Sequence, residues 1–164
     1  MKFVLSIIFL CFINIEKQVD NSLQTTELVS GLFAYTDYET GTAFAKKSQK
    51  PTLVYFRDRR SANCRKFEKS ILSDDKIKNY ISENFVLVSL LVDDNTQVTK
   101  PKTSTKTGKN LKTVGEINID IEMSLFQSDG QPYSALIDKE NKFKKGTGYI
   151  SEPKQFLKFL KSGK

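Results

Sequence analysis

The chain has 164 residues, a formal net charge of +7 and 38% hydrophobic residues. This length predicts a single domain, and this share of apolar residues is enough to form a core without support from a disulfide or a metal. Because the sequence contains no histidine and only two cysteines, it excludes both a four-ligand zinc site and a serine hydrolase with a histidine base, and we expect no metal and no cofactor.

The first 22 residues are typical of an export signal. Lys2 provides a short basic start, and an apolar run follows from Phe3 to Ile13. That run suits the core of a signal peptide and is shorter than the ~20 residues that a membrane span requires. We therefore expect residues 1–22 to be a signal peptide or a short hydrophobic anchor. No small-residue cleavage site follows them, so the position of cleavage stays open.

Helices and strands alternate along the rest of the chain. Polar residues 23–30 predict a linker. Beyond it, short apolar runs predict strands buried on both faces, and apolar residues at helical spacing predict amphipathic helices. In chain order, we expect a helix over 35–50, a strand over 51–56, helices over 61–72 and 73–85, a strand over 86–94, a helix over 115–126, a strand over 133–138, a further strand ending near 150, and a helix over 151–163. This order predicts an α/β domain over 31–164, with a mixed central sheet and helices on both faces.

A lysine-rich segment, residues 95–115, interrupts this alternation. It contains five lysines and no acidic residue: Lys100, Lys102, Lys106, Lys109 and Lys112. We expect a solvated, mobile loop. No arginine or aromatic residue lies between the lysines to read or stack bases, so we expect no nucleic-acid binding. A weak contact with an anionic membrane is the alternative.

The stretch RDRRSANCRKFEKS, Arg57–Ser70, holds the only cysteine beyond the signal segment. Ser61 is a good N-cap for the helix that follows, and Cys64 falls on its apolar face. Two interpretations of Cys64 stay open. It is either a single reactive thiol, favoured by nearby positive charge, or a buried small residue, as free cysteine usually is. The nearby basic residues are Arg59, Arg60, Arg65 and Lys66.

Several spaced blocks resemble one family. The segments NCRKFE, VLVSLLVDD, TGKNLKTVG, QPYSALID and FLKFLKSG occur in the order seen in thioredoxin-like domains. They are most similar to the C-terminal domains of bacterial transmembrane thiol:disulfide interchange proteins, the DsbD-type reductases of cytochrome c biogenesis. The resemblance implies a thioredoxin fold, with SANC in the place of the Cys-x-x-Cys motif. It also implies a cis peptide bond before Pro132, facing the motif, with Gln131 beside a peptide-binding groove.

The sequence departs from the active members of that family at three places. Ser61 replaces the attacking cysteine, so the resemblance makes Cys64 the resolving cysteine. Tyr55 stands where active members carry a buried carboxylate, and the aromatic residue that often precedes the motif is absent. Since two sulfurs are needed for reversible dithiol exchange, we expect no dithiol turnover.

These departures lead to a prediction of function. We expect a monomeric protein of the thiol-disulfide exchange class, outside the cytoplasm in a bacterial periplasm or at the outer face of the inner membrane. It would bind protein or peptide partners at the surface of Cys64 and Pro132, with a mixed disulfide as one route. The alternative is an enzyme, a monothiol thiol-disulfide oxidoreductase acting through Cys64.

Overall fold

The computed structural model describes residues 25–163, so the predicted signal segment lies outside the described residues. Six strands form one mixed sheet in the order β1-β2-β4-β3-β7-β8, and β5 and β6 form a separate two-stranded sheet. The strands are β1 (Thr25–Val29), β2 (Leu32–Tyr35), β3 (Thr52–Arg57), β4 (Val86–Leu91), β5 (Gln97–Thr103), β6 (Asn110–Thr113), β7 (Tyr133–Ile137) and β8 (Phe143–Thr147). The helical segments are α1 (Tyr38–Lys47), α2 (Ala62–Phe67), the π-helical turn η2 (Glu68–Leu72), α3 (Asp75–Asn84), α4 (Val114–Leu125) and α5 (Pro153–Lys161).

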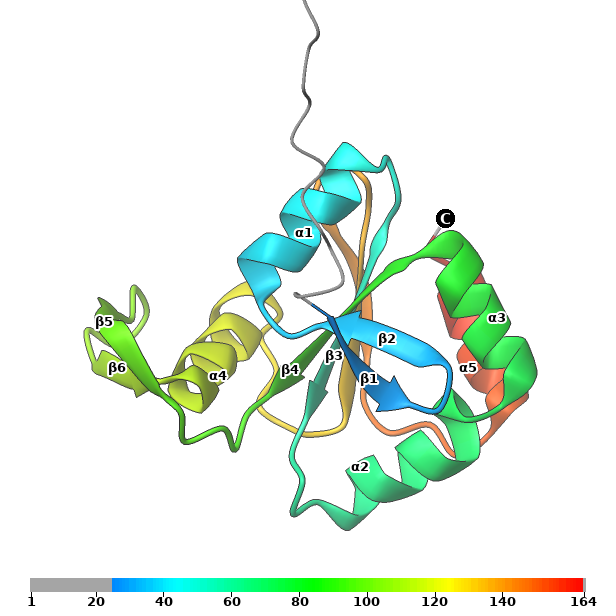
Figure 1. The fold of residues 1–164 in the computed structure, drawn as a ribbon, viewed down its shortest axis with the longest axis horizontal. Helices are drawn as coiled ribbons and strands as arrows, with labels where there is room; N and C mark the ends of the chain where they lie inside the picture. Colours follow the sequence, from blue (N-terminus) through cyan, green and yellow to red (C-terminus); the bar gives the residue numbers. More distant parts are fainter. Residues whose placement is uncertain (1–24, 164) are drawn as a thin grey trace, which may run out of the picture.

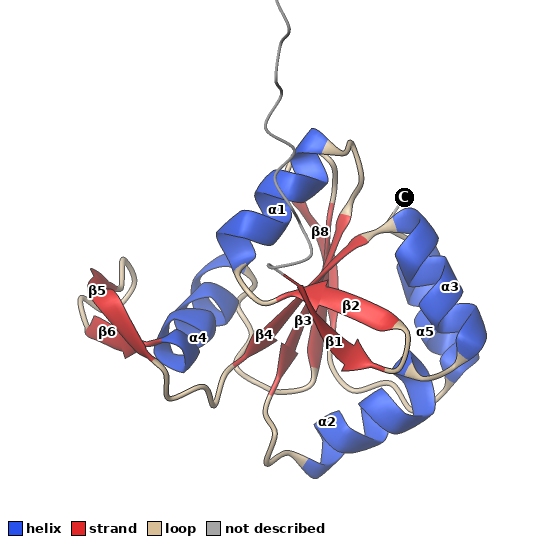
Figure 2. Ribbon diagram, viewed as in Figure 1, coloured by secondary structure: helices blue, strands red, loops and turns tan. Residues whose placement is uncertain are grey.

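Strand β3 lies in the middle of the sheet, parallel to β4 and antiparallel to β7. Helices α1 and α4 cover one face, and α2, α3 and α5 cover the other (Figures 1 and 2). One apolar cluster fills each side: Tyr55, Phe67 and Phe156 belong to the first, and Val54, Phe56 and Phe126 to the second. The predicted α/β class with a mixed sheet covered on both faces is confirmed.

The alternation within β3 explains why its sequence is almost uniformly apolar. Successive side chains of a strand point to opposite faces, so a strand covered on both sides needs apolar residues at every position. All of Thr52–Phe56 is buried. The predicted caps are also found: the Asp37 carboxylate accepts from Thr40 N at 2.8 Å at the start of α1.

The prediction of a linker over residues 23–30 is wrong for residues 25–29. Residues 25–29, within the expected linker 23–30, form β1, which pairs antiparallel with β2 and adds an edge to the sheet. The folded unit therefore includes residues 25–29 and does not begin at 31. An edge strand exposes one side and much of its backbone to solvent, so its sequence is polar and resembles a linker.

The prediction of a mobile loop over the lysine-rich segment 95–115 is also wrong. Most of it forms the β5–β6 hairpin, and α4 begins at Val114. The hairpin projects from the body of the domain beside α4 (Figure 1). The Ser104 hydroxyl donates to Asp120 of α4, which ties the hairpin to that helix. Lysine side chains on a short exposed hairpin give a composition like that of a loop, which is why the strands were not predicted.

Two boundaries also differ from expectation. The helix predicted over 61–72 ends as α2 at Phe67 and continues as the π-helical turn η2, and β8 ends at Thr147. Among residues 25–163, no helix is long and apolar enough to cross a membrane.

Candidate functional site

The register of the sheet brings two loops together. In the antiparallel pair of β3 and β7, Phe56 lies opposite Tyr133. The segment that follows Arg57 and the segment that precedes Tyr133 therefore lie at the same end of the sheet (Figure 1). We call them the motif loop (residues 58–61) and the proline loop (residues 127–132). The peptide bond from Gln131 to Pro132 is cis, which confirms that prediction.

Ser61 caps α2, as predicted. Its Oγ accepts a hydrogen bond from Cys64 N at 3.3 Å. The Cys64 side chain faces inward and is 1% exposed, and its Sγ accepts from Asp58 N at 3.5 Å. Within residues 25–163 this is the one cysteine, and it is free. The structure thus places the thiol in the buried position that one of the two interpretations required.

Three of the four basic side chains near Cys64, those of Arg59, Arg60 and Arg65, are engaged with acids and backbone. Arg59 Nε lies 3.2 Å from Asp93 Oδ2, and Arg60 donates to both carboxylate oxygens of Asp58. The side-chain hydrogen bond from Arg60 lowers the pKa of Asp58. Arg65 donates to Arg59 O at 2.8 Å. These contacts shape the motif loop and offset part of the positive charge that the sequence placed beside the thiol.

Glu68, which sequence reasoning missed, lies beside Tyr55 and Arg57. Tyr55 is 1% exposed, and its hydroxyl donates to Glu68 Oε1 at 3.3 Å. Arg57 Nε lies 2.8 Å from the same carboxylate oxygen. Burial, reinforced by the negative charge of Glu68, raises the pKa of Tyr55, so its hydroxyl stays neutral and cannot accept a proton. Glu68 lies four residues after Cys64, and this helical spacing was the available signal.

The proline loop is anchored by a second residue that the sequence did not single out. Glu122 of α4 is fully buried, and its carboxylate accepts from Gln131 Nε2 at 2.6 Å and from Ser128 Oγ at 3.1 Å. Burial raises the pKa of Glu122. The Gln131 side chain therefore points into the molecule.

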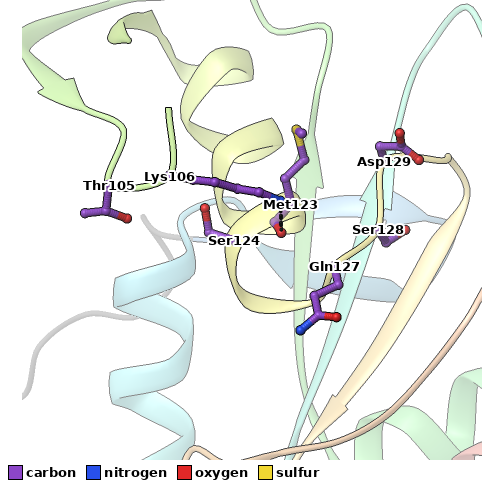
Figure 3. A pocket seen from close by; sticks show the side chains of 7 residues that line it. All are labelled: Thr105, Lys106, Met123, Ser124, Gln127, Ser128 and Asp129. Atoms are coloured by element: carbon purple, nitrogen blue, oxygen red, sulfur yellow. Dashed lines mark hydrogen bonds between the residues drawn. The ribbon is translucent and has the colours of Figure 1, made fainter. Parts of the chain in front are cut away.

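A cavity of about 610 Å³ opens beside the proline loop, between the tip of the β5–β6 hairpin and the end of α4. In Figure 3, Lys106 extends from the hairpin to Met123 O, while Ser128 and Asp129 lie on the other side of the helix. The lining residues are Thr105, Lys106, Met123, Ser124, Gln127, Ser128 and Asp129. The lining does not include Ser61, Cys64, Gln131 or Pro132.

The chemistry open to these groups is limited. A dithiol–disulfide cycle needs a second thiol, and the described residues hold one. The same residues contain no cluster of three or more histidine, cysteine or carboxylate groups that could hold a metal ion. The arrangement offers a capped helix start, a shielded thiol and a loop with a cis-proline at the same end of the sheet.

Solved structures share this fold at low sequence identity. A DsbH oxidoreductase is 17% identical with a TM-score of 0.59, covering 80% of this chain and 83% of that chain. A disulphide isomerase from Xylella fastidiosa Temecula1 is 19% identical with a TM-score of 0.55, covering 75% and 85%. The oxidised C-terminal domain of DsbD from Neisseria meningitidis is 10% identical with a TM-score of 0.55, covering 80% and 99%.

No curated protein matches the chain. The model of one protein family, described as a thioredoxin-like domain, does match it, over residues 38–164. That range begins with α1 and includes both the motif loop and the proline loop. The chain belongs to the thioredoxin-like domain family.

Proposed function

We propose that this protein is a member of the thiol-disulfide exchange class with a degenerate Ser-x-x-Cys site, which binds partner proteins without dithiol turnover. One observation carries the proposal. Ser61 keeps the start of α2 in place through its cap on Cys64 N, while Cys64 is 1% exposed. An alcohol at a helix start does not ionise near neutral pH and forms no bond equivalent to a disulfide, so the scaffold stays and the exchange chemistry is lost.

The partner-binding surface lies at the end of the sheet that the motif loop and the proline loop share. Because the Gln131 side chain points inward and Pro132 is buried, the proline loop would meet an extended polypeptide with its backbone. Backbone hydrogen bonds to an extended segment give affinity with little sequence preference. A partner of this kind needs no free thiol on either side.

Within the class, we propose that this chain is of the same type as the C-terminal domain of DsbD-type proteins. The order of the sequence blocks from NCRKFE to FLKFLKSG supports it. The structural likeness to the DsbD domain, at 10% identity, supports the fold alone. We also propose an extracytoplasmic location, because the apolar run that begins at Phe3 is typical of an export signal. Fractionation of cells tests this location. We further propose that the protein is a monomer, which light scattering tests.

An insulin-reduction assay with dithiothreitol tests the absence of turnover. We expect the native protein to leave the rate of insulin precipitation at the level of dithiothreitol alone. A matched dithiol thioredoxin serves as the positive control. Robust turnover by the native protein would overturn the proposal, because it would show that two cysteines are not needed.

The competing function is a monothiol oxidoreductase, which the retention of Cys64 at the motif position favours. A thiol titration of the folded protein separates the two. Slow modification that becomes fast after denaturation is expected from the buried Sγ. Fast modification of the folded protein, with a depressed thiol pKa, would instead support the enzyme.

A further inference from the structure

The fully buried positions of helix α4 hold a glycine and two polar side chains. Its buried residues are Gly115, Asn118 and Glu122, whereas Ile119 and Leu125 are 38% and 51% exposed. Ile121 packs against the core cluster, as the apolar stripe of a helix usually does, but no apolar side chain of α4 is fully buried. Each buried residue therefore calls for a specific reason.

Two of the three have a reason in packing. Gly115 lets the helix approach the backbone after β4, since a Cβ there would overlap the Val92 and Asp94 backbone. Asn118 Nδ2 donates to Leu91 O at 2.9 Å, which fastens the helix to the end of β4. Glu122 makes no such contact with the sheet, and its partners lie in the proline loop.

Glu122 holds the proline loop near both of its ends. Its Oε1 accepts from Ser128 Oγ at 3.1 Å, and its Oε2 accepts from Gln131 Nε2 at 2.6 Å. Its backbone oxygen accepts from Phe126 N and Ser128 N. Ser128 also lines the cavity beside α4, and Gln131 directly precedes Pro132. One residue thus fixes the segment that carries the cis-proline.

Stability alone does not account for a carboxylate at this position. Burying an ionised group is unfavourable unless it is paired with an opposite charge, and a well-packed apolar residue is usually as stable or more stable. Within residues 25–163, no lysine or arginine forms an ion pair with Glu122, and the charge of Asp129 acts against its ionisation. A group kept at a cost to stability, beside a candidate site, indicates a functional role.

We propose that Glu122 is a positioning residue, which holds residues 127–132 in the shape that binds an extended polypeptide at Pro132. This inference rests on the proposed partner-binding function and deepens it. A loop held in its bound shape before binding loses less conformational entropy when the partner arrives, so the affinity depends on the two hydrogen bonds to Glu122. Glu122 itself need not touch the partner.

The proposal gives opposite pH trends for stability and binding. Because burial places the folded-state pKa of Glu122 above its unfolded value, protonation of this group favours folding as the pH falls. The same protonation removes the negative charge that strengthens the bonds from Ser128 and Gln131, so binding weakens as the pH falls. The other groups that face Glu122 are the Asp129 carboxylate and the Tyr133 hydroxyl.

The probe for the experiment is reduced, carboxymethylated and fluorescein-labelled ribonuclease, an unfolded polypeptide without free thiols. Binding is followed by anisotropy with the full chain, and thermal melting by circular dichroism checks folding. We expect Glu122→Leu to melt at the wild-type temperature or higher and to bind roughly 5- to 100-fold more weakly, the range set by two lost hydrogen bonds. Asn118→Leu is the matched control, since it removes an equally buried polar group that faces β4. Its affinity should match that of the wild type.

A second variant keeps the test decisive if Glu122→Leu does not fold. Glu122→Gln preserves the volume and removes the titration, so the affinity ratio of wild type to Glu122→Gln should fall toward one as the pH is lowered. A ratio that does not change with pH overturns the inference, as does a folded Glu122→Leu that binds like wild type. If the wild type does not bind the probe at all, the proposed partner-binding function is itself overturned.

Discussion

Ser61 and Cys64 occupy the first and last positions of the segment SANC, and their roles in the fold are structural. The Ser61 side chain satisfies Cys64 N, which would otherwise lack a partner at the helix start. Cys64 contributes a small apolar group to the core side of α2 and an acceptor for Asp58 N. The serine hydroxyl and the one shielded sulfur therefore both support the start of α2.

We predict that Ser61→Cys forms a disulfide with Cys64 under mild oxidation. The preserved helix start should bring the two sulfurs within bonding reach, although the loss of the serine cap costs about 1 kcal/mol in the reduced state. Titration with a thiol reagent, together with intact mass, measures the loss of two thiols. Activity in the insulin assay should return only in part, because neutral Tyr55 stands where a carboxylate would accept a proton.

The control for this prediction is Ser70→Cys, which adds a cysteine at an exposed position of η2. It should keep both its new thiol and that of Cys64 under the same conditions. If the Cys64 thiol and the new thiol both stay titratable in oxidised Ser61→Cys, the backbone of the motif loop has diverged from disulfide geometry.

The residues of this site differ in how well the sequence alone could predict them. Ser61 and Cys64 could be predicted because a cap and an apolar helix face depend on neighbours three or four positions away. Glu122 could not, since its partner Gln131 lies nine residues along the chain and meets it only after α4 and β7 have packed. Glu68 offered its helical spacing from Cys64 as a signal, but its contact with Tyr55 spans thirteen residues and depends on how the helix packs on β3.

Among the elements, α4 and the β5–β6 hairpin form one substructure. Thr113 and Glu116 make a reciprocal capping box at the start of α4. The Glu116 carboxylate also accepts from Lys112 N at 2.7 Å and from Lys109 Nζ at 3.0 Å. The backbone bond from Lys112, with that from the Lys109 side chain, lowers the pKa of Glu116 to about 2.

We predict that Glu116→Gln destabilises the protein at neutral pH and that the difference disappears in acid. The folded-state pKa lies below the unfolded one, so the stabilisation is complete above the ordinary pKa of glutamate and is lost as the pH falls toward about 2. Urea unfolding of wild type and variant over a pH series measures this difference. Glu83→Gln, at an exposed position of α3, is the control and should show no such trend. A difference that grows on acidification would contradict the role assigned to Glu116.

The elements that the sequence predicted well are those with apolar side chains on both faces or on one helical stripe. Strands β3 and β4 and helix α5 belong to this group, and their order determines the fold. Strand β1 and the β5–β6 hairpin were missed, since their residues are mostly polar and gain their structure from hydrogen bonding along an edge. Strand β2 was missed as well, and its Tyr35 was assigned to the following helix, because a four-residue apolar segment is too short to show a period.

At the scale of the whole molecule, the net charge of +7 is distributed unevenly. The hairpin segment carries five lysines, but three of them are engaged within the domain. Lys102 Nζ lies 2.9 Å from Glu39, Lys109 pairs with Glu116, and Lys106 donates to Met123 O. Lys100 and Lys112 are exposed and are the two that can approach an external anionic surface without breaking such a contact.

We predict weak, salt-sensitive binding of the full chain to vesicles rich in phosphatidylserine. Each lysine near an anionic surface contributes about 1 kcal/mol, so two give roughly a 30-fold effect that falls off as salt shortens the screening length. Replacing Lys100 and Lys112 together by glutamate should abolish most of the binding in a co-sedimentation assay. The same replacement at Lys144 and Lys145, exposed on β8, changes the net charge equally and should have a smaller effect. Equal loss from both pairs would assign the contact to the charge of the whole molecule, and binding that does not change with salt would remove the electrostatic contact altogether.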